Sequence, residues 1–282
     1  MVVVLSFRTN SLKGERKMPV QVPSKWNKEV DVVVLGTGGA ALTAAIAAAD
    51  GGASVLVLEK THQIGGTTAY SGGVPWIPLN HYMQEAGFQD DREEAIQFIE
   101  RLALGRADKK MIETFVDHAH VMIKYLADHT PTKFTTPRSY PEYYARMGEA
   151  LKQGTRSLDP LPYDLNEIGE WGPLVRQNPL FPPLTLAEGG AVGGIDFQKV
   201  AERMQNNIVT MGRSLIASLF KATLDRDVET LINTAGKQLV MNDDEQVVGV
   251  VAENNDGETL YFGARKGVIL ASGGYEWNKE LV

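Results

Sequence analysis

Two glycine-rich segments carry the strongest signs of chemistry in this 282-residue sequence. The first follows an apolar run and reads Gly-Thr-Gly-Gly-Ala-Ala over residues 36–41, a G-x-G-x-x-A spacing. Its glycines permit a tight turn after a strand and a close approach of the backbone to a pyrophosphate, and the small last residue lets a helix pack on the strand. The helix N-terminus offers a partial positive charge to phosphate. We therefore expect a dinucleotide to contact Gly36, Gly38, Gly39, Ala40 and Ala41.

An acidic residue ends the next apolar run, where this type of loop places a ribose. The carboxylate of Glu59 can accept hydrogen bonds from a ribose diol, and an acid is expected about 20 residues after the glycines. Lys60 and Thr61 follow directly and belong to the same predicted site. The alternatives are an ordinary βαβ unit with a tight turn and a solvated strand end at Glu59.

The second glycine-rich segment reads Gly-Gly-Thr-Thr-Ala-Tyr-Ser-Gly-Gly over residues 65–73. Paired glycines would let the backbone reach another part of a long cofactor, and hydroxyl groups would donate hydrogen bonds to it. We expect contacts from Gly65, Gly66, Thr67, Thr68, Ser71, Gly72 and Gly73. This favours an extended dinucleotide held along its length, which leaves both NAD and FAD open.

The elements that must position these loops form a βαβ unit. Residues 30–35 and 55–58 are short apolar runs typical of buried parallel strands. Residues 38–50 between them are rich in alanine, which lets a helix approach a sheet closely, and Gly51 and Gly52 end that helix. The fold class indicated is α/β.

The rest of the chain alternates helical and extended patterns. Amphipathic helices are predicted over 91–101, 110–127 and 198–224, and strands over 246–252, 259–262 and 266–271. Residues 130–197 are rich in proline, and a stretch of that length without regular elements is unusual unless it is functional. The acidic residues 243–245 are expected to form a solvated turn.

Composition excludes several classes of function. The net charge of −7 argues against a nucleic-acid partner, and the absence of cysteine excludes disulfides, thiolate zinc sites and cysteine nucleophiles. His118 and His120 are two residues apart and point to different helix faces, so no metal site is predicted. No apolar run reaches the roughly 18 residues of a membrane span, and residues 1–7 lack the features of a signal peptide, so a cytoplasmic location is expected. Residues 1–28 are predicted to be a loose tail.

The motifs as a set resemble a known flavoprotein family. Residues 31–42, 57–60, 64–80 and 267–276 are similar to the FAD-dependent oxidoreductase 2 family, the fumarate reductase/succinate dehydrogenase flavoproteins. Within it, the 3-ketosteroid Δ1-dehydrogenases resemble the chain most, because a Trp-Ile-Pro run at residues 76–78 follows the second glycine-rich segment. The resemblance covers about residues 30–282.

The resemblance implies a Rossmann-like FAD-binding domain with a central parallel sheet, a small β-meander and added helices. It implies a non-covalently bound FAD, because the only histidine beside the second loop, His62, is expected to be a solvated loop residue. It also implies that Ala271, Ser272 and Gly273 lie near the adenosine end of FAD. Members of the family are about twice as long, so residues 29–282 are expected to be an incomplete FAD-binding domain without the substrate-capping domain.

The implied activity is desaturation of a ring carbon–carbon bond next to a ketone, with a steroid-like ketone as substrate. Tyr144, with Tyr143 as second choice, is expected to support the catalytic base by a hydrogen bond. Packing in a proline-rich loop is the alternative for these tyrosines. For Arg156, a phosphate or substrate contact and a surface ion pair are both open.

Two further interpretations of the chain remain. It could belong to a fumarate-reductase-type flavoprotein that reduces an unsaturated carboxylate, or it could be a truncated FAD-binding fragment without catalysis. From residues 1–282 alone we expect little or no turnover.

Overall fold

The structure is a computed structural model that describes residues 20–137, 140–150, 156–189, 194–276 and 278–280. Most of the predicted N-terminal tail, residues 1–19, lies outside the described residues. The chain divides into two compact units, which are described separately. Unit 1 combines Met1–Ile64 with Thr223–Val282, and unit 2 is Gly65–Ala222. None of the described helices is both long enough and apolar enough to cross a membrane.

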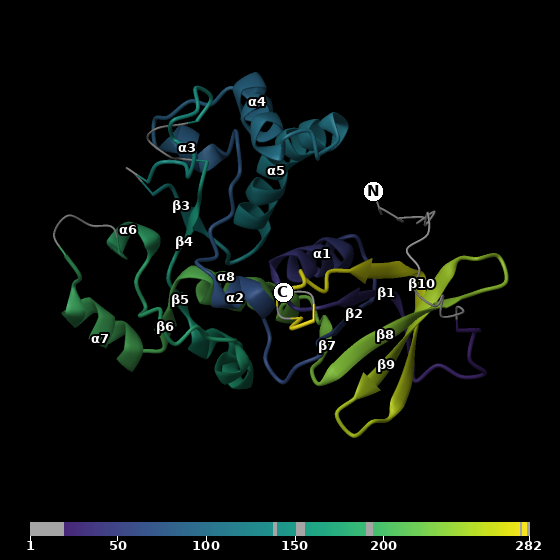
Figure 1. The fold of residues 1–282 in the computed structure, drawn as a ribbon. Helices are drawn as coiled ribbons and strands as arrows, with labels where there is room; N and C mark the ends of the chain where they lie inside the picture. The colour runs from purple at the N-terminus through teal and green to yellow at the C-terminus, as the bar shows by residue number, and fades with distance from the viewer. Residues whose placement is uncertain (1–19, 138–139, 151–155, 190–193, 277, 281–282) are drawn as a thin grey trace. The chain divides into compact units, whose positions relative to one another are not determined.

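Unit 1 is built on a six-stranded sheet with the order β7-β2-β1-β10-β9-β8 (Figure 1). Its strands are β1 (Lys28–Leu35), β2 (Val55–Leu58), β7 (Glu229–Leu231), β8 (Thr234–Met241), β9 (Val247–Asn254) and β10 (Thr259–Leu270). The neighbours β7, β2, β1 and β10 run parallel, whereas β9 and β8 extend the sheet in antiparallel pairs. The predicted α/β class with a central, mostly parallel sheet is confirmed.

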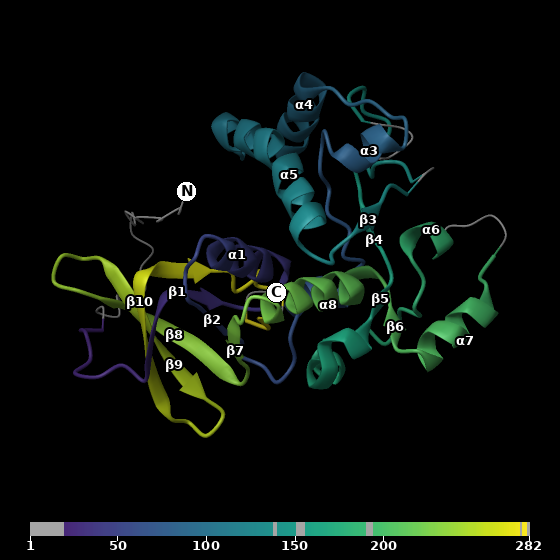
Figure 2. The ribbon, with the colours of Figure 1, turned by 180° about the vertical axis from the view of Figure 1, so that it is seen from behind.

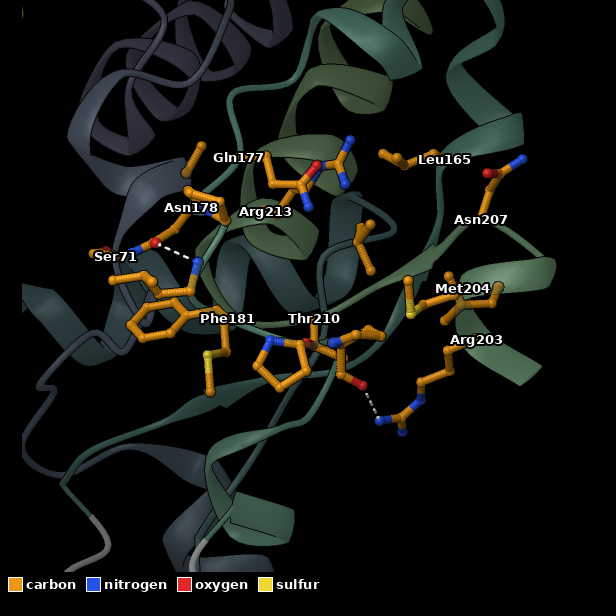
Figure 3. A pocket seen from close by; sticks show the side chains of 18 residues that line it. Ser71, Leu165, Gln177, Asn178, Phe181, Arg203, Met204, Asn207, Thr210 and Arg213 are labelled. Atoms are coloured by element: carbon orange, nitrogen blue, oxygen red, sulfur yellow. Dashed lines mark hydrogen bonds between the residues drawn. The ribbon is translucent and has the colours of Figure 1, made fainter. Parts of the chain in front are cut away.

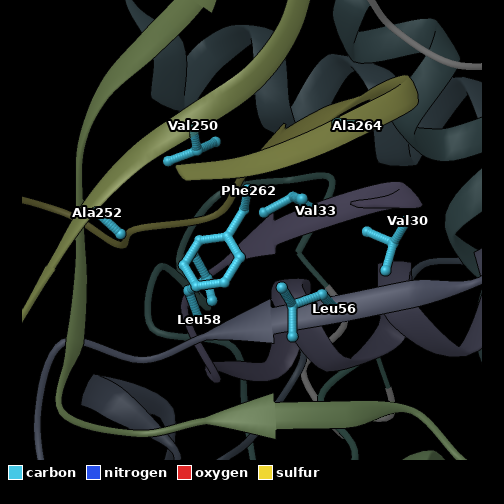
Figure 4. Packing of buried hydrophobic residues seen from close by; sticks show 8 residues of the cluster. All are labelled: Val30, Val33, Leu56, Leu58, Val250, Ala252, Phe262 and Ala264. Atoms are coloured by element: carbon cyan, nitrogen blue, oxygen red, sulfur yellow. The ribbon is translucent and has the colours of Figure 1, made fainter. Parts of the chain in front are cut away.

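Helix α1 (Gly39–Asp50) connects β1 to β2 and covers one face of the sheet. Ala41 and Ala45 of α1 pack on Val32, Val34 and Val57. Because side chains alternate between the two faces of a strand, Val33, Leu56 and Leu58 enter a second cluster on the opposite face, together with Phe262 (Figure 4). The βαβ unit therefore has the boundaries that its apolar runs predict, to within two residues.

Strand β10 differs from the prediction of two separate strands. It is one strand of 12 residues, in which Thr259–Gly263 pair with β9 in antiparallel fashion and Phe262–Leu270 pair with β1 in parallel. The predicted β-meander is thus the edge of the central sheet, because β10 belongs to both. The acidic residues 243–245 form the turn between β8 and β9, as predicted.

Unit 2 consists of helices joined by long connections and two very short strand pairs. Its helices are α2 (Gly66–Tyr70), α3 (His81–Glu85), α4 (Arg92–Ala103), α5 (Lys109–His129), the 3-10 helix η1 (Leu165–Leu174), α6 (Leu186–Gly189), α7 (Phe197–Gln205) and α8 (Met211–Leu224), the last of which ends in unit 1. The strands β3 (Phe134–Thr135) and β5 (Tyr163–Asp164) pair with β4 (Asp159–Pro160) and β6 (Ile208–Val209).

The predicted helices of unit 2 are confirmed in two cases and divided in the third. Helices α4 and α5 begin at the side-chain caps of Asp91 and Asp108, which accept from the backbone N–H groups of Glu94 and Lys110. The region 198–224 is not one helix, because β6 separates α7 from α8. Asn207 and Met211 flank this break with positive φ angles of 56°, which an α-helix does not allow.

Candidate functional site

Two segments that the sequence places far apart meet at the carboxyl ends of β1 and β10 in unit 1. The N–H of Ala271 donates to the carbonyl oxygen of Leu35 over 3.1 Å, so the loops that follow the two strands begin side by side. Gly36 has a φ of 108°, and a Cβ there would lie 2.5 Å from the carbonyl oxygen of Ala271. The close approach therefore requires glycine at position 36. In open α/β sheets, such a place between neighbouring loops, where the strand order reverses, is where ligands bind.

The N-terminus of α1 is free of side-chain caps. Its N-cap residue, Gly38, has extended backbone angles and supplies no side-chain hydrogen bond, and the first turn holds no acidic residue. Most helix starts are satisfied by a Ser, Thr, Asp or Asn side chain, so a bare start next to a glycine turn suits an anion. Ala40 of the first turn is exposed, whereas Ala41 is buried against the sheet.

Glu59 is buried and held by two threonines of unit 1. Thr37 Oγ1 donates to its Oε2 over 2.6 Å, and the N–H of Thr61 donates to its Oε1 over 3.0 Å. The Thr61 hydroxyl lies 3.1 Å from Oε1 but shares its hydrogen with the carbonyl oxygen of Gln63, which is 2.7 Å away. The side chain is thus no solvated strand end, and its orientation is fixed from both oxygens. A carboxylate has about four acceptor sites, so at least one remains for a ligand hydroxyl. The sequence alone did not single out Thr37, because it occupies the variable position of the glycine motif and its partner, Glu59, is distant in sequence. The neighbouring Lys60 is exposed.

The second glycine-rich segment contains α2 of unit 2. Gly65 caps α2 with a φ of 105°, and a Cβ there would lie 2.6 Å from the Cβ of Ala69. A Cβ on Gly73 would overlap the backbone of Gly212, and one on Gly212 would overlap the carbonyl of Thr68. These glycines let α2 lie directly against the start of α8 (Figure 1); Figure 2 shows α8 from the opposite side. Gly212 was not foreseen.

The other members of this segment differ in their surroundings. A Cβ on Gly66 would meet nothing within 4 Å, so that position is open. Thr67 is exposed and Thr68 is half-buried. Ser71 is exposed, but its hydroxyl already donates to the carbonyl of Thr68 and accepts from the N–H of Gly73. Packing thus accounts for several of the predicted cofactor residues here, whereas Gly66 and Thr67 are accessible.

A family model described as FAD binding domain matches residues 31–281. The chain belongs to the FAD binding domain family. FAD is therefore the cofactor, and the choice between NAD and FAD that the glycine motifs leave open is settled in favour of FAD. The family resemblance read from residues 31–42 and 267–276 is confirmed.

Two curated relatives of this FAD-binding chain are dehydrogenases by name. The 4-oxocyclohexanecarboxylate 2-dehydrogenase of Sinomonas cyclohexanicum is 32% identical over 260 residues, which cover 89% of this chain and 44% of that protein. The 3-oxosteroid 1-dehydrogenase of Mycolicibacterium smegmatis is 32% identical over 276 residues, which cover 90% of this chain and 48% of that protein. The chain thus spans about half the length of the curated relatives it matches.

A solved structure gives the same result for the fold. The crystal structure of 3-ketosteroid delta1-dehydrogenase from Sterolibacterium denitrificans in complex with 1,4-androstadiene-3,17-dione matches with a TM-score of 0.81 at 28% sequence identity. The match covers 90% of this chain and 49% of that one.

The residues of unit 1 fit a part of FAD. The uncapped start of α1 suits the charge of a pyrophosphate, and the remaining acceptor site of Glu59 suits a ribose hydroxyl. Gly36, which has no side chain, packs directly on the backbone of Ala271. His62 is exposed, as expected for a solvated loop residue.

Arg156 of the FAD-binding chain lies in an environment that its sequence context did not predict, which was either a phosphate or substrate contact or a surface ion pair. Its guanidinium is fully buried in unit 2 and donates to Asp90, with Nη2 2.6 Å from Oδ1. A second carboxylate, Glu142, lies 3.5 Å from Nη1, and the ring of Trp76 lies 5.5 Å from Cζ. The alternative of a surface ion pair is therefore wrong, because the pair is buried. Because the guanidinium is fully buried and faces two carboxylates, it is not placed to hold a phosphate.

The predicted catalytic tyrosines lie on an exposed turn of unit 2. Tyr144 is 55% exposed and Tyr143 is 91% exposed. The hydroxyl of Tyr140 donates to that of Tyr143 over 3.5 Å, and this bond with burial raises the pKa of Tyr140 to about 12. Gly154 and Thr155, which accompany the tyrosine stretch in sequence, lie outside the described residues. The supporting role of Tyr144 stays a prediction.

The histidines of α5 are tied to their own helix. Nδ1 of His118 lies 2.8 Å from the carbonyl oxygen of Thr114, and Nδ1 of His120 lies 3.2 Å from that of Val116. Within the described ranges, no group of three His, Cys, Asp or Glu residues could hold a metal ion.

Proposed function

We propose that the chain is the FAD-binding portion of a dehydrogenase that desaturates a ring carbon–carbon bond next to a ketone. The observation that carries the proposal is that the loops at Gly36 and Ala271 meet beside the uncapped start of α1. Residues 31–281, which include both loops, match the FAD binding domain family. The names of both relatives describe dehydrogenases of oxo-substituted ring compounds. FAD, when bound, supplies the acceptor for the hydride that such a reaction removes.

Each predicted contact residue of unit 1 is assigned to one part of FAD in this proposal. The first turn of α1, which includes Gly38, Gly39 and Ala40, binds the pyrophosphate, and Glu59 accepts from a ribose hydroxyl beside Lys60 and Thr61. The proposed neighbours of the adenosine end are Ala271, Ser272 and Gly273, of which Ser272 and Gly273 are exposed. FAD is bound non-covalently in this proposal, which the exposed position of His62 supports.

The residues of the second loop are proposed contacts of the same cofactor on sequence grounds alone. Among them, Gly66 and Thr67 are the accessible ones, so these two are the first to test. Replacement of Thr67 by Val is expected to weaken FAD binding, whereas Thr67→Ser keeps the hydroxyl and is expected to retain it. Equal affinities of the two variants would remove Thr67 from the site.

Tyr144 is proposed to support the catalytic base of the complete site. A hydroxyl that is 55% exposed in this chain is accessible to a partner group. Tyr144→Phe should lower the rate of dehydrogenation without changing the affinity for FAD, and Tyr143→Phe is the matched control. A rate that falls only in the control variant would assign the role to Tyr143 instead.

The test of the proposed function has two parts. The purified chain should bind FAD, which is measured by the visible spectrum of the flavin and by the quenching of its fluorescence. The chain alone should show little or no turnover, so the second part uses a complete enzyme that contains this chain, which should reduce an artificial electron acceptor when a ring ketone is added. A protein that stays colourless with FAD would refute the cofactor assignment for this chain. Reduction of fumarate with no reaction toward ring ketones would favour the reductase alternative.

A further inference from the structure

A cavity of about 510 Å³ lies entirely within unit 2, between the connection after η1, the break between α7 and α8, and the second glycine-rich segment (Figure 3). Its volume is in the range of small-molecule sites, about 300–1,000 Å³. The residues that line it include two arginines, Arg203 and Arg213, and no carboxylate. The cavity is therefore electropositive.

The two arginines differ in their partners. Arg203 forms a bidentate ion pair with Glu188, over 2.5 and 3.0 Å, and also donates to the carbonyl oxygen of Pro183. Arg213 has no ion pair with any of the described residues, and its Nε is buried without a hydrogen-bond partner. Burial lowers the pKa of Arg213, since it disfavours the charged form. The Nε–H of Arg213 has thus lost water without gaining an acceptor, which is energetically costly.

The remaining walls suit an apolar ligand with one charged end. Leu180, Phe181 and Met204 line the cavity and are 80%, 43% and 67% exposed. Exposed apolar side chains of this size around one site are typical of a ligand-binding groove. Gln177, which also lines the cavity and is exposed, offers an amide that can donate to a carboxylate oxygen.

We propose that this cavity binds a ring-containing organic acid, with its carboxylate on Arg213 and its ring against Leu180, Phe181 and Met204. A guanidinium matches a carboxylate with two parallel hydrogen bonds. The single unpaired arginine and the apolar rim favour a monocarboxylate over a phosphate or a dicarboxylate. If the proposed function holds, the inference narrows its substrate class to oxo-substituted ring carboxylates rather than neutral ketones; the binding itself does not depend on that function.

The experiment compares two ligands of the same shape and different charge. Calorimetric titration of the chain with cyclohexanecarboxylate and with cyclohexanecarboxamide should show at least about 10-fold tighter binding of the acid, since a charged hydrogen bond contributes about 1.5–3 kcal/mol. Arg213→Gln should abolish this preference and Arg213→Lys should retain part of it. Arg146→Gln, which removes an exposed arginine outside the cavity, is the matched control and should keep the preference.

Each outcome decides the proposal. Equal affinities for acid and amide in the unaltered chain, no binding of either, or an unchanged preference in Arg213→Gln would overturn it. The ligand comparison uses the unaltered chain, so the test stands even if a variant fails to fold. Acid binding by the chain without ketone-dependent dye reduction by the complete enzyme would refute the proposed function and leave the cavity assignment intact, whereas dye reduction by the complete enzyme without acid preference of the chain would do the reverse.

Discussion

The indole Nε1 of Trp76 donates a hydrogen bond of 3.0 Å to Oε1 of Glu142, which lies 66 residues further along the chain. Trp76 belongs to the Trp-Ile-Pro run and Glu142 to the tyrosine stretch, so the bond joins two motifs of the family resemblance inside unit 2. Arg156 Nη1 lies 3.5 Å from the same oxygen of Glu142, and the N–H of Ile77 donates to the Arg156 carbonyl over 2.6 Å. Both motifs thus rest on one buried polar cluster.

Arg156→Met should destabilise unit 2 strongly. Removal of the guanidinium leaves the buried carboxylates of Asp90 and Glu142 without their cation, which costs about 3–5 kcal/mol. Urea unfolding measures the change in the free energy of unfolding. Lys124→Met breaks an exposed ion pair with Asp128 and should cost less than about 1 kcal/mol. Similar losses in both variants would show that the buried cluster is not a stabilising feature.

Gly36→Ala should weaken FAD binding and lower stability by about 1–3 kcal/mol, because the new Cβ meets the Ala271 carbonyl at a positive φ. Gly257→Ala is the matched control, since Gly257 also has a positive φ, 78°, but a Cβ there meets nothing within 4 Å. The measurement is the quenching of flavin fluorescence as FAD is titrated. Unchanged affinity in Gly36→Ala would remove this turn from the cofactor site.

Thr37→Val should lower stability by about 1.5–3 kcal/mol, because buried Glu59 loses the donor that lies 2.6 Å from Oε2. Thr114→Val, on the surface of α5, replaces a hydroxyl that donates to a backbone carbonyl and should have little effect. Thermal unfolding compares the two variants. If FAD restores the stability of Thr37→Val, then a ligand hydroxyl can replace the threonine as donor to Glu59.

Gly212→Ala should destabilise unit 2 by about 2–3 kcal/mol, because its Cβ would overlap the Thr68 carbonyl and separate α2 from α8. Gly148→Ala is the control in the same unit, where a Cβ meets nothing within 4 Å. Urea unfolding of both variants gives the comparison, and a stable Gly212→Ala protein would show that the two helices tolerate a wider spacing.

Acid should weaken unit 1 partly through Asp31. Hydrogen bonds from the Ser54 N–H and from Arg265 lower the pKa of Asp31 from 3.8 to about 2. A depressed carboxyl pKa stabilises the folded state above the unfolded value of 3.8, and that contribution disappears as the pH falls through about 2. Asp31→Asn should therefore show a smaller loss of stability between pH 4 and pH 2. In Arg265→Met, an NMR titration should find the Asp31 pKa closer to 3.8.

The elements around the cofactor loop could be predicted from sequence because their signals are local. The apolar runs at 30–35 and 55–58 and the glycines between them lie within one βαβ unit, so periodicity and spacing suffice. The single strand β10 could not be predicted, because its two halves are defined by different partners, β9 and β1. Pairing partners that are distant in sequence leave no local pattern.

The same reason explains the errors at single residues. Arg156 is buried because Asp90, Glu142 and Trp76 surround it from three other parts of unit 2, and an isolated arginine in a sequence gives no hint of them. Gly212 was overlooked because its contact partner, Thr68, is in another segment. The role proposed for Arg213 could not be predicted either, because a sequence does not show that a buried arginine nitrogen lacks a hydrogen-bond partner.

The position of β10 has a consequence for synthesis of the protein. Strand β1 is made first, yet one of its two neighbours, β10, leaves the ribosome only after all of unit 2, a delay on the order of ten to fifty seconds at usual elongation rates. Unit 2 is synthesised in that interval, while the apolar edge of β1 remains unpaired. The nascent chain therefore passes through a period in which the edge at residues 30–35 is open to pairing with another chain and to aggregation.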